Sequence, residues 1–388
     1  MGLSKGFYFA FYGAGASLSP YLALYYQSLH LGGEQIGVLR ALPSLVVMLV
    51  TPLWAGLADA THGHKRILLL ALIGTLAGSV GLFLGQTFWA LVPIVLLYAT
   101  FSAPVMSLVD SSMMVMLGGE RGRYGRLRLW GAVGWGLMGP IVGALVDRYS
   151  LSYAFYGYYV LVGVTLLIAL GLPIRTTRLQ TSYWKGFREL ARNRRWLLFL
   201  ATMFIYTAGR ATLETLLFLH LGTIGVSESL MGLSLAVASL SELPVYFYSD
   251  ELLRRLGPRR LLLVSMAATL IMLLGVGWMR APWLILVIQL LHGPSFSAMW
   301  VASVSLVAGM APEGLGATAQ GIFSSVSMGI GAAAASLLGG MLLQRFGGAW
   351  MYTVDAGLVL VSMFVLVLVT RRQPLAPQDA PGQPSASV

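Results

Sequence analysis

Long apolar stretches of about twenty residues recur along the whole chain, and short polar segments separate them. Each stretch is long enough to cross about 30 Å of hydrocarbon. Because backbone amides in lipid must find their hydrogen-bond partners within the segment, each stretch is predicted to be a helix. The pattern predicts an all-α integral membrane protein with about twelve transmembrane helices, over residues 6–28, 36–58, 66–86, 88–116, 128–147, 152–173, 197–221, 229–249, 259–279, 283–310, 316–344 and 349–370.

The chain divides into two similar halves. Its longest polar interruption lies near the midpoint and is basic and partly amphipathic, as expected of a cytoplasmic segment along the headgroups. The sequence "GHKR" at 63–66 is followed by the similar "GPRR" at 257–260, and this offset of 194 residues is half of the 388 residues. Such a parallel repeat is typical of secondary transporters. We therefore predict an N-terminal six-helix bundle (1–173), a cytoplasmic basic linker (174–196), a C-terminal six-helix bundle (197–371) and a disordered cytoplasmic tail (372–388).

The composition narrows the class of protein. Hydrophobic residues make up 57% of the chain and charged residues 10%, whereas soluble domains carry about 25% charged residues. Zero cysteines exclude disulfides and thiolate metal ligands. The sequence contains no phosphate-binding G-x-x-x-x-G-K-S/T motif, no nucleophile–base arrangement and no metal cluster. We therefore expect no enzyme, no cofactor and no metal, and a proton gradient, not ATP, as the energy source.

The net charge of +11 reflects topology. With the N-terminus inside, all but five of the 25 lysines and arginines fall in segments that twelve spans place in the cytoplasm. The exceptions are Arg210 in mid-membrane and, towards the outer side, Arg40, Arg148, Arg280 and Arg345. We expect a multi-pass protein of the bacterial cytoplasmic (inner) membrane, with both termini cytoplasmic and the lipid bilayer, not nucleic acid, as its partner.

Ionisable residues inside spans are costly and mark pathways or pairs. Asp110 and Arg128 lie 18 positions apart on helices that a short loop folds back on each other, so they can form an ion pair that a polar solute could enter. The alternatives are that Arg128 anchors at headgroups and that Asp110 caps a local hydrogen-bond network. Trp135 stands among glycines, as a cavity wall would, while Tyr8 and Tyr12 share one helix face that can line the same cavity.

The second half has its own ionisable residues. Arg210 and Glu214 lie four residues apart on one helix face, either as part of the site or as a permanent salt bridge. Glu242 lies just before Pro244. A carboxyl group that alternates between an apolar environment and a nearby arginine can load and release a proton. We predict Glu242 as the protonatable acid, with Glu214 as the alternative. Asp355 also lies inside a span.

Several of these stretches resemble the major facilitator superfamily. The run from "GLAD" to "GHKR" is similar to the loop between its second and third helices, which implies a conformational-switch role for Asp59, Gly63, Lys65 and Arg66. Ala55 and Ala60 depart from the usual form. The segments "FYFAFYGAGASLSPYLALYYQ" and "YGRLRLWGAVGWGLMG" resemble the branch that holds lactose permease and the phenylpropionate permeases.

This resemblance implies specific roles. In the sugar-transporting relatives, an acid and an arginine at the positions of Asp110 and Arg128 hold the hydroxyls of the solute, and a tryptophan at the position of Trp135 stacks on it. His292 matches a histidine of their proton-coupling region, and a packing role is the alternative. Ser295 replaces the acid that follows it, and span nine lacks the expected arginine. Coupling must then be rebuilt from Glu242, Glu214, Asp110 and Arg210.

The leading hypothesis is a monomeric secondary transporter that uses rocker-switch alternating access. By resemblance, it couples symport of a small polar organic solute to protons; a sugar or glycoside is favoured, and an aromatic acid or a nucleoside is possible. Arg210 joins the predicted solute-binding residues because it would suit a carboxylate. The first alternative is a proton-coupled antiporter that exports drugs or metabolites. The second is a lipid carrier or a sensory membrane protein.

Overall fold

The computed structural model describes residues 2–116, 121–173, 190, 192–312 and 315–371. Within these ranges the secondary structure is helical, without strands. The all-α prediction is confirmed. The N-terminal half comprises α1 (Gly2–Leu18), α2 (Leu22–Ser28), α3 (Gly33–Thr61), α4 (His64–Leu84), α5 (Phe88–Met116), α6 (Arg121–Arg148) and α7 (Ser152–Gly171).

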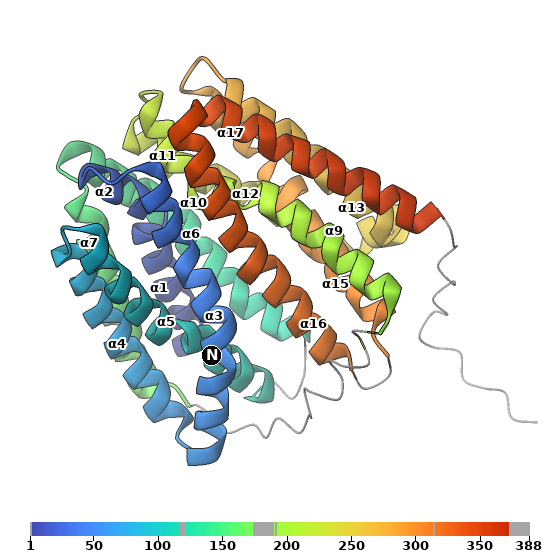
Figure 1. Cartoon of the computed structure of the whole chain (residues 1–388). Coiled ribbons are helices and arrows are strands. Elements are labelled where there is room, and N and C mark those ends of the chain that lie inside the picture. The colour runs from blue at the N-terminus through green and yellow to red at the C-terminus, as the bar shows by residue number, and fades with distance from the viewer. Residues whose placement is uncertain (1, 117–120, 174–189, 191, 313–314, 372–388) are drawn as a thin grey trace, which may run out of the picture.

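The C-terminal half has more breaks in its helices. It comprises α9 (Arg194–Arg210), α10 (Thr212–Thr215), α11 (Leu217–Thr223), α12 (Glu228–Phe247), α13 (Ser249–Trp278), α14 (Leu284–Gln289), the π-helix η1 (Gly293–Ser297), α15 (Ala298–Met310), α16 (Gly316–Ser324), the π-helix η2 (Ser325–Gly331) and α17 (Ala332–Arg371). Figure 1 shows α17 as two rods that meet at a sharp bend.

The described helices make up the predicted twelve spans. Ten helical stretches are long and apolar enough to cross a membrane. The last of them, Thr318–Leu368, turns back at Gly347 (φ 78°, ψ 171°) and therefore makes two crossings. The first span is missing from these ten because it is broken into α1 and α2, each shorter than a membrane helix.

The described residues include only some of the predicted boundaries between bundles, linker and tail. Helix α9 begins at Arg194, inside the predicted linker, because the Asn193 side chain accepts hydrogen bonds from the first free amides and caps the helix. Residues 174–189 and 191 of the linker and the whole tail lie outside the described residues. The cytoplasmic position of the termini stays a prediction.

The two halves each begin with a broken membrane helix. The first span breaks between Leu18 and Leu22, and the seventh span breaks between Arg210 and Leu217. Adding the repeat offset of 194 to residues 19–21 of the first break gives residues 213–215, which lie within the second break. Broken helices at corresponding positions of two repeats are typical of a transporter's binding region.

Close contacts between the halves gather at one end of the molecule, which we call the closed end; the opposite end, where the chain enters and leaves residues 174–193, is the linker end. Helix α3 packs beside the first arm of α17, which precedes the bend at Gly347 (Figure 1), and a Cβ atom at Gly37 would lie 2.5 Å from the carbonyl oxygen of Ser336. Helix α6 meets α12 with the same closeness. Small residues allow this approach of backbones.

Two polar contacts also join the halves at the closed end. The Arg345 guanidinium lies 3.0 Å from a Glu34 carboxylate oxygen. The Ser229 hydroxyl donates to Asp147 at 2.6 Å. The closed end is the outer side if the positive-inside expectation holds.

Candidate transport site

The N-terminal half brings four of the predicted solute-binding residues together. Helices α5 and α6 run antiparallel, and Arg128 Nη1 lies 2.9 Å from Asp110 Oδ2. From α1, the Tyr8 hydroxyl donates to Asp110 Oδ1 at 2.6 Å, and the Tyr12 ring lies 5.9 Å from the Arg128 guanidinium carbon. The side chains of Arg128 and Asp110 keep 51% and 25% of their exposure, so the pair is accessible to a solute.

Trp135 lies seven residues after Arg128 on α6, which is about two helical turns. Its ring covers the backbone of Gly15 on α1, where a Cβ atom would lie 3.0 Å from the ring. Trp135 is partly buried. The ring thus fills the space that a side chain at position 15 would occupy. The exposed part of the ring can line a cavity.

The C-terminal half places Arg210 and Glu214 beside each other at the break in the seventh span. Arg210 Nη2 lies 2.7 Å from Glu214 Oε1. The Arg210 side chain is 1% exposed and its guanidinium carbon lies 5.0 Å from the Phe296 ring centroid, whereas Glu214 is 37% exposed. Glu214 is therefore the accessible member of the pair, and the buried Arg210 holds its carboxylate.

Glu242 and His292 form a second pair in this half. His292 Nε2 lies 3.2 Å from Glu242 Oε1, and both side chains are about one-fifth exposed. His292 directly precedes the π-helix η1, a type of irregularity that is frequent at functional sites. The sequence identified both residues, but it gave no reason to expect that they touch.

Tyr246 lies one turn after Glu242 on α12, and the sequence analysis missed it. It is near enough to Glu242, and to Arg128 and Tyr12 of the other half, for their charges to act on it. Its position four residues after Glu242 was the available signal.

The predicted conformational-switch residues lie apart from these groups, at the linker end. Gly63 precedes α4 as its N-cap residue, Lys65 Nζ donates to the Leu170 carbonyl at 2.6 Å, and Arg66 is exposed. Asp59 belongs to the last turns of α3, and its side chain lies outside the described part of the chain.

Two further ionisable residues have unexpected environments. Arg40 lies seven residues inside α3 and therefore about 10 Å below its end. Asp355 is 1% exposed and accepts a hydrogen bond of 2.6 Å from Thr212, the first residue of α10. Within the described ranges, no cluster of three histidine or acidic side chains could hold a metal ion.

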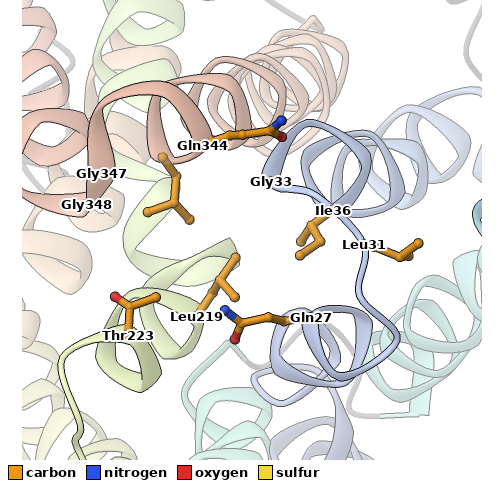
Figure 2. A pocket seen from close by; sticks show the side chains of 10 residues that line it. Gln27, Leu31, Gly33, Ile36, Leu219, Thr223, Gln344, Gly347 and Gly348 are labelled. Atoms are coloured by element: carbon orange, nitrogen blue, oxygen red, sulfur yellow. The ribbon is translucent and has the colours of Figure 1, made fainter.

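A cavity of about 250 Å³ lies at the closed end, and none of its lining residues belongs to the three pairs Asp110–Arg128, Arg210–Glu214 and Glu242–His292. Figure 2 shows that segments of both halves surround it. Its lining is neutral: Gln27, Leu31, Gly33, Ile36, Leu219, Thr223, Leu343, Gln344, Gly347 and Gly348. It is smaller than the roughly 300–1,000 Å³ of most ligand pockets.

Comparison with known proteins agrees with this architecture. The chain is 27% identical over 379 residues to a maltose permease of Geobacillus stearothermophilus, covering 96% of this chain and 95% of the permease. It is 25% identical over 373 residues to a probable 3-phenylpropionic acid transporter of Escherichia coli, covering 94% and 96%. The crystal structure of the nucleoside transporter NupG superposes with a TM-score of 0.85 at 16% identity, covering 96% of this chain and 100% of that one.

A family model matches almost the whole chain. It is the model of the MFS_1 like family, and it matches residues 3–354. The relatives and the solved neighbours named above are transporters, not enzymes. This multi-pass membrane protein is a transporter of the major facilitator superfamily and belongs to the MFS_1 like family.

Proposed function

We propose that this transporter carries a small neutral polar solute, with a sugar or glycoside favoured, in symport with protons. The observation that carries the proposal is charge balance. Each of the three ionisable pairs in the described part of the site joins a carboxylate to a basic group: Asp110 with Arg128, Glu214 with Arg210, and Glu242 with His292. Arg128 and Arg210 each already contact a carboxylate, so an anion could bind either arginine only by displacing that carboxylate.

A hydroxyl group fits this arrangement better than a carboxylate does. It can accept a hydrogen bond from Arg128 and donate one to Asp110 without separating two opposite charges. A solute carboxylate would have to displace Asp110 and leave that charge uncompensated in a weakly polar environment. Tyr12 adds an aromatic face beside the pair. An aromatic acid and a nucleoside stay as less favoured solutes.

Proton coupling is supported by the contact between Glu242 and His292. A carboxylate and an imidazole at 3.2 Å can share a proton, and histidine changes charge near neutral pH. Arg210, which contacts Glu214, is near enough to Glu242 for their charges to interact. In our proposal Glu242 loads the proton while Asp110 and Arg128 hold the solute.

The closed end determines which side of the membrane the described conformation faces. If this end is the outer side, as the positive-inside expectation requires, the conformation described is inward-facing. Rocking of the halves would break the contact of Glu34 with Arg345 and that of Asp147 with Ser229, and open the site to the outside. Solute and proton would then enter together and leave to the cytoplasm.

The test is reconstitution in liposomes that contain a lumenal pH dye. Inward gradients of sugars, aromatic acids and nucleosides are imposed one at a time, with protein-free liposomes as the control. We expect acidification with a neutral sugar or glycoside. Alkalinisation would mean exchange and would favour the antiporter. No response from a protein whose folding is confirmed would contradict proton symport and favour a lipid carrier or a sensor.

A further inference from the structure

Arg40 is a partly buried cation without an ion-pair partner among the described residues. Its Nη1 donates to the Ser19 carbonyl at 3.1 Å, and its Nε is buried without a hydrogen-bond acceptor. No carboxylate of the described residues lies within 4.0 Å of the guanidinium. A charged group inside a membrane protein is costly, so it marks a functional contact by default.

The position of Arg40 is tied to the break in the first span. Ser19 directly follows α1, where the last carbonyl groups of a helix have no partner within the helix. Arg40 satisfies one such group and is held beside the break. The break at the corresponding repeat position of the other half contains Glu214.

These two breaks lie across the interface from each other. The Tyr21 ring, in the first break, meets the Phe218 ring of α11 edge to face at 5.0 Å between centroids. Glu214 lies one turn before Phe218. Among the carboxylates, Glu214 is the one that acts electrostatically on Arg40. Glu214 thus contacts Arg210 of its own half, and its charge also acts on Arg40 of the other half beyond ion-pair distance.

We propose that Arg40 is a positioning residue of the transport cycle, which attracts Glu214 across the interface and so stabilises the closed end. Any event that removes the charge of Glu214 or moves its side chain, whether a proton or a solute, then weakens closure and favours opening. This inference rests on alternating access, but it does not depend on which solute or ion the protein carries.

The absence of cysteine from the chain makes the test direct. Leu219 is 2% exposed and lines the cavity between the halves, so Leu219→Cys reports opening of the closed end through its rate of labelling by a membrane-impermeant maleimide. We expect Arg40→Met and Glu214→Gln each to raise this rate about three- to tenfold, which is the effect of a modest ion-pair energy. Arg40→Lys should restore most of the slow rate.

The double variant decides between a shared contact and two separate effects. If Arg40 acts through Glu214, the double variant should label no faster than either single variant. Arg148→Met is the matched control, because Arg148 stacks on Tyr149 of its own half. Unchanged labelling in Glu214→Gln, or rates that multiply in the double variant, would overturn the proposal. Since labelling needs neither solute nor proton gradient, this result is independent of the liposome assay.

Discussion

At the scale of single residues, the contact between Asp110 and Arg128 separates a transport role from simple anchoring. A lysine keeps the charge of Arg128 but loses the planar, multiply donating guanidinium. We therefore expect Arg128→Lys to reduce solute uptake roughly ten- to a hundredfold, as loss of a charge-assisted hydrogen bond should. The measurement is initial uptake into liposomes. Arg148→Lys at the closed end is the control. Uptake at the wild-type rate in Arg128→Lys would instead indicate that Arg128 only anchors its helix at the lipid headgroups.

A second prediction concerns the acid that loads the proton. Glu242→Gln removes the group that can share a proton with His292 but keeps a similar shape. We expect it to abolish solute-driven acidification of the lumen, while exchange of labelled for unlabelled solute stays measurable because exchange needs no net proton movement. Glu228→Gln, on the same helix, is the control. Persistent acidification in Glu242→Gln would leave Glu214 as the proton carrier.

The sequence predicted some of these contacts and not others, for physical reasons. The pairs of Asp110 with Arg128 and Arg210 with Glu214 follow from short spacings that a hairpin or one helical turn brings together. The contact of Glu242 with His292 spans 50 positions between different helices, and no local pattern encodes it. The hydrogen bond of Arg40 to the Ser19 carbonyl likewise joins two different helices and has no local signal in the sequence.

At the scale of helices, the spans could be predicted because lipid leaves the backbone no alternative to the helix. Their breaks could not. Pro20 signals a break in the first span, but the seventh span breaks at Ala211 and Leu216 without a proline. Hydropathy sums over about twenty residues and is insensitive to the conformation of one or two. Tertiary contacts such as that of Asp355 with Thr212 hold such breaks.

The glycine packing of α3 against α17 gives a prediction at this scale. In Gly37→Val the new side chain would meet the backbone of Ser336 and Gly340, which cannot move aside as a flexible side chain can. Overpacking costs about 1–3 kcal/mol, so we expect the closed end to open and Leu219→Cys to be labelled about tenfold faster. Gly163→Val is the control, because nothing lies within 4 Å of a Cβ there. Equal labelling rates in the two variants would show that this contact does not hold the halves together.

At the scale of the whole molecule, the parallel repeat makes a strict demand on topology. Thr61 and Arg255 are 255 − 61 = 194 positions apart, both are exposed, and six spans separate them. An even number of crossings returns the chain to the same side of the membrane. By the positive-inside rule that side is the cytoplasm. Ser28 and Thr223, both exposed at the closed end, must lie together on the other side.

Single cysteines at these four positions test orientation and repeat together. In intact cells, an impermeant maleimide should label Ser28→Cys and Thr223→Cys, and should reach Thr61→Cys and Arg255→Cys only after the cells are opened. The reverse result would turn the closed end to the cytoplasm and make the described conformation outward-facing. Different sides for Thr61→Cys and Arg255→Cys would refute an even number of spans between them.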